Sequence, residues 1–278
     1  MTHNSQRKRP QIRTLCQSPM LTELNGLTSS VDLPECGEND LLFIICRSGS
    51  FEFRSGRDYY YLSECEALLI HSRGASPAIC FPSDDCDAMF MIIDRREVFF
   101  ISAQLVFDRL MSGAGTMISL GSDALEVIEK LETKAHSLGQ EYTKHKCEEL
   151  ILLMCLNAER QKEEDCRACT EEQFELARRA KQLINADLSK KLTIRQLADA
   201  LQVSETKLKL TFTRVYGLPV YSYTKKLKMK KGAALLAEND KTILEIAGEL
   251  GYDNGSKFSE AFRSVFGKSP REYRAENK

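Results

Sequence analysis

Two hydrophobic periods divide the chain, and the change between them falls close to Asp94. Before that residue, apolar side chains occur in short runs or at every second position, which is typical of β-strands. The segments with this pattern are Leu41–Arg47, Phe51–Arg54, Asp58–Tyr61, Ala67–Ser72, Ala78–Phe81 and Ala88–Ile93. Ser55 and Gly56 separate two of them and predict a hairpin turn. Many short strands with regular turns predict a small sandwich or barrel.

After Asp94 the apolar positions recur at helical spacing. Leu125, Ile128, Leu131 and Leu138 predict one face of a first helix, and Leu150, Leu153, Met154 and Asn157 one face of a second. Two such helices could pack on the strands, on each other or on a second copy of the chain. Residues 161–170 are charged and polar and predict a linker, whereas residues 1–15 predict a flexible tail.

Residues 171–278 predict seven short helices, and a helix-turn-helix pattern spans residues 193–216. Thr193 is expected to cap the first helix of this pair and Ser204 the second, which ends at Gly217. The expected buried positions are Ile194, Leu197, Ala198, Leu201, Leu208, Phe212 and Val215. Small Ala198 lets the two helices cross closely and Val203 fills the turn, so the helix that follows Ser204 is the one that would enter a DNA groove.

The same arrangement returns at residues 243–266. Ile243, Ile246, Ala247 and Leu250 predict its supporting helix, and Phe258, Phe262 and Phe266 the inner face of the next. Gly251 permits the turn, and either Asp253 or Asn254 caps the second helix. Tyr221–Ala237 predicts a connecting helix. Two such patterns joined by a helix of fixed length indicate DNA binding much more strongly than one.

Charge is distributed unevenly along the chain. Residues 171–278 hold 21 Lys and Arg against 14 Asp and Glu, a formal charge of +7, whereas residues 1–170 carry −8. Lys190–Lys231 concentrates the excess, with 11 basic residues and only Asp199 and Glu205 as acids. Such asymmetry favours a nucleic acid as the partner of the C-terminal half, although a solvated helical surface would also explain it.

The sequence gives no sign of export, of a membrane span or of catalysis. The first 13 residues are polar and basic, without the apolar stretch of a signal peptide. Apolar runs reach about six residues, far below the ~20 that a membrane span needs, so a cytoplasmic protein is expected. No phosphate-binding loop, Gly-x-Ser-x-Gly motif or carboxylate pair is present, and neither an enzyme nor a cofactor is expected.

Leu192–Arg274 resembles the DNA-binding domain of AraC/XylS-type regulators. The matching pieces are LTIRQLADALQVSETKLKLTFTRVYG, YTKKLKMKKGAALLAENDKTILEIAGELGY and SKFSEAFRSVFGKSPREYR. The segment from Ile246 through Pro270, with Tyr273 and Arg274, is the most specific. The resemblance implies a sequence-specific regulator of transcription, more often an activator that contacts RNA polymerase, that inserts two recognition helices into adjacent major-groove segments of double-stranded DNA.

Carried over position by position, the resemblance implies a set of DNA-contacting residues. The first recognition helix would present Thr206, Lys207, Lys209, Leu210 and Arg214, and the second Gly255, Ser256, Lys257, Ser259, Glu260 and Arg263. Lys209 could donate to guanine, and Glu260 could accept from cytosine. Phosphate contacts are expected from Lys207, Lys225, Lys226, Arg214, Arg263 and Lys268. Two positions depart from the family: Leu210 replaces a polar group, and Gly232 replaces alanine in the connecting helix.

The N-terminal half more loosely resembles the cupin-like sensor domain of such regulators. The expected fold is therefore α+β with two domains: a cupin-like β-barrel with a helical dimerisation segment over residues 16–160, and an all-α tandem helix-turn-helix domain over residues 171–278. The resemblance implies a homodimer and a small-molecule effector. The candidate effector pocket is Arg47, Phe51, Phe53, Tyr59, Tyr61, His71 and Arg73, although the aromatic members could instead be barrel core.

The identity of the effector and the role of the cysteines stay open. Residues 206–217 resemble the siderophore-responsive branch of the family, which implies an iron chelate. The four histidines contain no His-x-His pair, so no metal site is expected in the barrel. The alternative is a redox- or metal-responsive regulator that senses through Cys166 and Cys169, but no second pair of matching spacing completes the four ligands that zinc wants.

Overall fold

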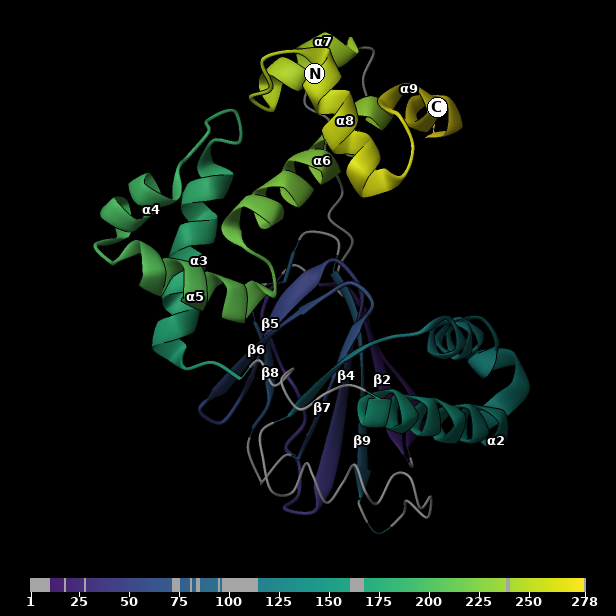
Figure 1. Ribbon diagram of the computed structural model, residues 1–278. Coiled ribbons are helices and arrows are strands. Elements are labelled where there is room, and N and C mark those ends of the chain that lie inside the picture. Colours follow the sequence, from purple (N-terminus) through teal and green to yellow (C-terminus); the bar gives the residue numbers. More distant parts are fainter. Residues whose placement is uncertain are drawn as a thin grey trace. The chain divides into compact units, whose positions relative to one another are not determined.

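The computed structural model folds as two compact units, an N-terminal unit, Met1–Thr170, and a C-terminal unit, Glu171–Lys278 (Figure 1). The structure describes residues 11–17, 19–27, 29–71, 76–80, 82–83, 86–94, 96, 115–160, 168–238 and 241–277. Within these ranges, no helix is both long enough and apolar enough to cross a membrane.

The described part of the N-terminal unit holds two antiparallel sheets. The first has the strand order β1 (Gln11–Gln17), β2 (Met20–Leu27), β9 (Cys86–Asp94), β4 (Asp40–Ser48), β7 (Glu66–His71) and β10 (Thr116–Ser119). The second has the order β3 (Val31–Asp32), β8 (Ala78–Cys80), β5 (Ser50–Ser55) and β6 (Asp58–Ser63). The predicted hairpin is present, because Ser55 pairs with Asp58 where β5 turns into β6.

Strand β4 is buried on both faces, which explains its uninterrupted apolar run. Leu42, Ile44 and Cys46 point into a core between the two sheets. Leu41, Phe43 and Ile45 point the other way, into a second core beneath α2 (Ser122–Arg160). The six-stranded sheet is therefore the middle layer, with the smaller sheet on one face and α2 on the other.

Helix α2 is broken at Gly139, whose φ of 84° lies in the left-handed region. Both halves cover the six-stranded sheet, as one of the predicted packings had it. The predicted faces were partly wrong: Leu125 and Leu138 are exposed, and Val127 and Ala135 are buried instead. Apolar residues on these helices form two neighbouring stripes, so the sequence alone does not tell which stripe is buried. The contact with the sheet decides it.

The strand architecture corrects two further expectations. The cupin-like closed barrel is not confirmed, because the described strands form two separate sheets, and the chain passes from one to the other at Gly49, between β4 and β5. The flexible tail was predicted to end at residue 15, yet residues 11–17 form β1, which pairs with β2. Its polar composition is explained by its position, because an edge strand keeps one side in water.

A buried charge cluster ties α2 to the sheet. Arg47 on β4 donates hydrogen bonds to Glu132 on α2 and to Asn25, and its guanidinium lies 3.9 Å from the Glu23 carboxylate. Burial raises the pKa of Glu23, and Arg47 opposes that shift. The cluster lies on the face of the six-stranded sheet that α2 covers, and it links β2, β4 and α2.

Arg47→Ala is expected to destabilise the N-terminal unit by about 2 kcal/mol at pH 7, because it leaves the buried Glu23 carboxylate without its cation. The loss should shrink as pH falls, since a raised pKa means that folded Glu23 takes up a proton more readily than the unfolded chain does. Urea denaturation at pH 7 and pH 4.5 measures both effects. Arg96→Ala, which breaks the exposed pair with Asp94, is the control and should change stability by less than ~1 kcal/mol. Equal losses for the two variants would contradict this account.

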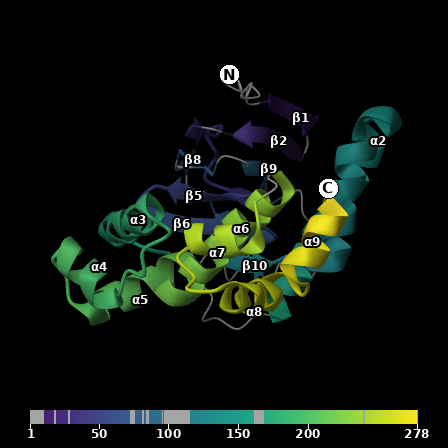
Figure 2. The same ribbon diagram turned by 90° about the horizontal axis from the view of Figure 1, so that it is seen from above.

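The C-terminal unit contains seven helices in its described residues, as the sequence predicted. They are α3 (Glu171–Ala186), α4 (Ile194–Leu201), α5 (Glu205–Tyr216), α6 (Val220–Glu238), α7 (Ile243–Glu249), α8 (Gly255–Phe266) and α9 (Pro270–Asn277). Helix α6 lies in the middle, with α4 and α5 on one side and α8 and α9 on the other (Figure 2). It therefore connects two helical groups within one unit.

Candidate nucleic-acid interface

The first helix pair is set by its capping residues. The Thr193 hydroxyl accepts a hydrogen bond from the Gln196 backbone at 3.2 Å, and the Gln196 side chain accepts one from the Thr193 backbone at 2.9 Å. The helix then ends at Gln202 in a left-handed conformation, and Ser204 caps α5 through the Lys207 N–H. These caps hold α4 and α5 in the helix-turn-helix arrangement that the sequence predicted.

The second pair repeats the device. Thr242 and Glu245 form the same reciprocal box at the start of α7, and the backbone N–H of Thr242 lowers the pKa of Glu245 by donating to its carboxylate. Asn254, one of the two predicted candidates, caps α8. Gly251 has a φ of 72°, and a Cβ there would lie 1.9 Å from the Ser189 carbonyl oxygen. Glycine at this position therefore permits both the left-handed turn and the close approach of the α3–α4 loop, which contains Ser189.

Helix α6 joins the two pairs through a packed interface. Met229, Ala233 and Leu236 lie in one core with α7 and α8. Gly232 faces the Phe258 ring, which would lie 3.1 Å from an added Cβ. Of the two roles that the sequence left open for this glycine, the structure supports close packing. The connection is thus a continuous helix whose second half is embedded in the second helix pair.

The sequence-predicted contact residues of α5 lie on its exposed face. Thr206, Lys207, Lys209 and Arg214 are exposed, and Leu210 exposes 68 % of its surface. The opposite face holds Leu208, Phe212 and Val215, which are fully buried. The five candidates are therefore available to a partner, and an apolar side chain stands among them.

On α8 the candidates are less uniform. Ser256, Lys257, Glu260 and Arg263 are exposed, whereas Gly255 and Ser259 are half-buried. The Ser259 hydroxyl donates to the Gly255 carbonyl at 2.7 Å, so its hydrogen is already used within the helix. Ser259 is thus better placed to accept than to donate.

Most cations on these faces are held in exposed ion pairs. Lys207 pairs with Glu172 at 3.1 Å, Lys209 with Glu205 at 3.3 Å, Lys257 with Asp253 at 3.5 Å and Arg263 with Glu272 at 3.8 Å. Lys268 pairs with Glu276. Exposed pairs of this kind contribute about 0–1 kcal/mol. A phosphate group could therefore displace the carboxylates at little cost.

The predicted effector-pocket residues do not form one site. Phe51 and Phe53 are fully buried between the two sheets, whereas Arg47 belongs to the charge cluster on the α2 side of the larger sheet. Tyr61 sits on β6 one position from Tyr60, which fills the intersheet core in its place. Phe51 and Phe53 therefore follow the core alternative that the sequence left open, whereas Tyr61 does not.

The remaining pocket candidates are also scattered. The His71 Nε2 atom lies 2.7 Å from the Glu38 carbonyl oxygen, and the ring is buried at the end of β7. Tyr59 is half-buried and pairs through its backbone with Cys169. Arg73 lies outside the described residues. The described members of the set therefore lie at separate places, and an effector site in the N-terminal unit stays a prediction.

The structure adds no support to the alternative in which the chain senses through Cys166 and Cys169. Cys166 lies outside the described residues, and Cys169 is buried where it pairs with β6. In the described parts of the chain, no group of three or more His, Cys, Asp or Glu side chains is placed to hold a metal ion. Sensing through these two cysteines therefore stays a prediction.

One feature beside the two recognition helices escaped the sequence interpretation. Tyr221, near the start of α6, exposes 79 % of its surface. With Lys191, Lys225 and Tyr252 it borders a groove that reaches Lys257 and Glu260 on α8. Lys225 was expected to contact phosphate, but the polar and apolar residues along α6 form no consistent helical stripe, so the sequence offered no signal for the exposed Tyr221.

Comparison with known proteins agrees with the helix arrangement. Residues 197–276 match a family model described as a helix-turn-helix domain. The Msm operon regulatory protein of Streptococcus mutans is 30 % identical over 96 residues, 34 % of each chain. The F1 operon positive regulatory protein of Yersinia pestis is 35 % identical over 71 residues, 26 % of this chain and 24 % of that protein. The matched part of this chain thus spans between 24 % and 38 % of the length of these and similar curated relatives.

A solved structure from Chromobacterium violaceum, described as a transcriptional regulator with an AraC-type DNA-binding domain, is 26 % identical. It covers 38 % of this chain and 95 % of its own, with a TM-score of 0.36. The matched residues and the capped helix pairs define a helix-turn-helix domain. Residues 197–276 of this chain form such a domain of the AraC type.

Proposed function

We propose that the chain is a sequence-specific regulator of transcription that inserts α5 and α8 into successive major-groove segments of double-stranded DNA. The observation that carries this proposal is the repeated geometry: two capped helix pairs, each with one exposed face, joined by a single continuous helix. Adjacent major-groove segments on one face of the duplex lie about one helical turn, ~34 Å, apart. A helix connector suits a fixed separation of that kind.

Within this proposal the exposed residues divide by role. Lys209 on α5 and Glu260 on α8 would read bases, because a Lys can donate to guanine and a Glu can accept from cytosine. Leu210 would contact a thymine methyl group. Lys207, Lys257 and Arg263 would exchange their present carboxylate partners for phosphate oxygens, which makes binding steeply dependent on salt.

The N-terminal unit would supply regulation. We propose that it responds to a small effector and pairs two chains, and that the DNA-bound protein contacts RNA polymerase in the cytoplasm. Leu138, with 54 % of its surface exposed on α2, supports a pairing surface on that helix. The backbone bridge between Tyr59 and Cys169 supports a route for the effector signal, because it anchors the chain two residues before α3 to the edge of the smaller sheet.

Lys209→Ala is expected to weaken binding to a selected DNA site by about 1–3 kcal/mol and to relax base preference at one position. Fluorescence anisotropy with the selected duplex and with a scrambled duplex measures both effects at one salt concentration. Arg195→Ala is the matched control, since Arg195 is an exposed cation on the supporting helix α4. An equal loss on both duplexes would assign Lys209 to a phosphate, and no loss on either would remove α5 from the interface.

A further inference from the structure

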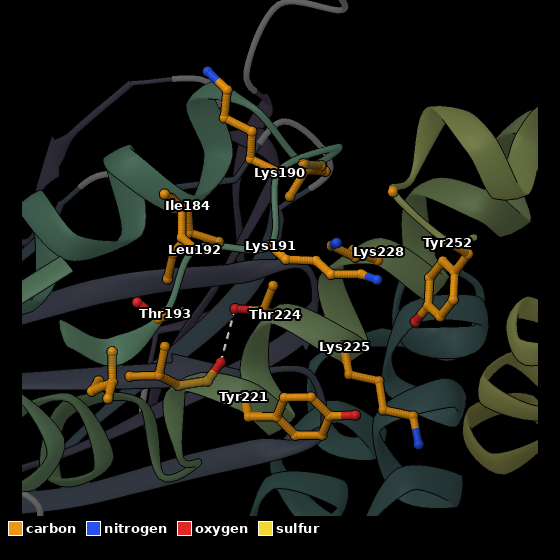
Figure 3. A pocket seen from close by; sticks show the side chains of 14 residues that line it. Ile184, Lys190, Lys191, Leu192, Thr193, Tyr221, Thr224, Lys225, Lys228 and Tyr252 are labelled. Carbon is orange, nitrogen blue, oxygen red and sulfur yellow. Dashed lines mark hydrogen bonds between the residues drawn. The ribbon is translucent and has the colours of Figure 1, made fainter. Parts of the chain in front are cut away.

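A pocket lies inside the C-terminal unit, apart from the two exposed recognition faces. It has a volume of about 400 Å³ and lies between the α3–α4 loop, the first half of α6 and the Gly251–Tyr252 turn. Figure 3 shows the Lys190–Thr193 segment on one side and Tyr252 on the other, with Thr224 and Lys228 between them. The volume falls in the range of small-molecule sites, roughly 300–1,000 Å³.

The walls of the pocket are largely apolar. Ile184, Leu188, Leu192 and Val220 contribute aliphatic surface, and Tyr252 contributes an aromatic ring. The Thr224 hydroxyl donates a hydrogen bond to the Val220 carbonyl oxygen at 2.8 Å. The methyl group is therefore the part of this side chain that is left for an apolar ligand. A ligand would therefore need an apolar body.

Four lysines also line the pocket, and one of them is unusual. Lys190 pairs with Asp187 at 3.3 Å and Lys191 with Asp253 at 3.0 Å, both near the surface. Lys228 exposes only 7 % of its surface, and its Nζ lies 5.7 Å from the centre of the Tyr252 ring. Among the described residues no carboxylate pairs with its ammonium group.

An ammonium group on a largely buried side chain that makes no ion pair is energetically costly. Burial lowers the pKa of Lys228 and the neighbouring Lys191 lowers it further, whereas Asp187 partly opposes these shifts. An anion beside Lys228 would remove that penalty. Lys228 therefore offers a positive charge to an anionic group that enters the pocket.

We propose that this pocket binds a small amphipathic anion, with a carboxylate or sulfonate that pairs with Lys228 and an apolar body against Leu188, Leu192 and Tyr252. The phosphate backbone of DNA is the competing source of negative charge. It fits less well, because it brings no apolar group to fill the aliphatic wall.

The position of the pocket gives such a ligand influence over the whole unit. Thr193 and Ile194 belong to the first helix pair, Lys228 to the connector and Tyr252 to the second pair. A ligand in contact with all three would favour one relative placement of the two pairs. If DNA prefers the same or another placement, ligand and DNA must change each other's affinity by equal factors; this consequence, unlike the binding itself, rests on the proposed function.

The test uses the full chain and two fluorescent probes of matched shape. 1-Anilinonaphthalene-8-sulfonate carries the anion, and N-phenyl-1-naphthylamine is its neutral analogue. Lys228→Met, which keeps the length of the side chain and removes its charge, is expected to weaken binding of the sulfonate about tenfold, as the loss of a charge-assisted contact does. Binding of the neutral probe should be unchanged.

Lys241→Met, which removes an exposed lysine outside the pocket, is the control and should bind both probes as the parent chain does. Lys228→Arg should retain sulfonate binding. Leu192→Glu, at a rim position that exposes 37 % of its surface, should also weaken sulfonate binding about tenfold by repulsion. The proposal is overturned if Lys228→Met binds the sulfonate as tightly as the parent chain, if it loses both probes equally, or if Leu192→Glu has no effect. Because no DNA is present, these outcomes are independent of the proposed function.

Discussion

Gly251→Ala is expected to destabilise the C-terminal unit by roughly 2–5 kcal/mol, and so to weaken DNA binding at 37 °C. Two costs add at this position. A left-handed backbone costs a non-glycine residue about 1–2 kcal/mol, and Gly251 has a φ of 72°. The new Cβ would also lie 1.9 Å from the Ser189 carbonyl oxygen, which is backbone and cannot rotate away. Relief would require the α3–α4 loop to separate from the second turn, with an overpacking cost of about 1–3 kcal/mol.

Thermal and urea denaturation of the full chain, followed by helical circular dichroism, measure this effect. Gly248→Ala is the matched control three residues away. A Cβ at Gly248 meets nothing within 4 Å, and the residue lies inside α7. Alanine there should stabilise the helix by up to ~1 kcal/mol. If both variants melt with the parent chain, the close approach of the loop to Gly251 is wrong.

Lys231→Pro is expected to weaken binding to a two-part DNA site by about 100-fold or more. Proline in a helix interior costs about 3 kcal/mol and kinks the helix. Lys231 is an exposed position within α6, so the substitution breaks the connector without removing a buried side chain. Each helix pair could then bind on its own, but the advantage of binding both at a fixed separation, typically 10²–10⁴-fold, would be lost.

The control for this prediction is Lys231→Ala, which removes the same charge and keeps the helix. It should weaken binding less than tenfold, as the loss of one phosphate contact would. Anisotropy titrations with duplexes of one and of two recognition segments separate the two effects. A proline variant that binds the two-part duplex within threefold of the parent chain would show that the connector does not set the separation.

The helical part of the fold could be predicted because the side chains at the helix ends determine where each helix begins and ends. Thr193, Ser204, Asn254 and Gly217 cap helices through their own side chains or backbone freedom, and each acts where it was predicted. Thr242 was missed, although Glu245 three residues later completes its capping box. Local signals of this kind survive without knowledge of the tertiary structure.

The N-terminal unit was less predictable because its outcome depends on contacts between distant segments. The apolar runs of β4 and β9 were found, but β1, β2 and β10 were missed: their side chains are mixed, and they join an existing sheet at or towards its edges. The barrel was expected from the pattern and order of the strands. Whether strands close into a barrel is decided by pairings that no single strand encodes.

The same distinction holds for the candidate sites. Exposure of Lys207, Lys209 and Lys257 follows from helical phase, which the buried phenylalanines fix. The pocket around Lys228 could not be foreseen, because it joins a loop, a helix and a turn that are separated in sequence. A lysine in a basic stretch is expected to face water, and only packing against Tyr252 places it inside.

Selection of the full chain on random-sequence duplexes, with sequencing of the bound pool, tests the central claim most directly. Two capped helix pairs on one helical connector predict a motif of two conserved segments whose centres lie about 10 base pairs apart, one turn of the duplex. Enrichment of a single uninterrupted segment, or of no sequence at all, would contradict it.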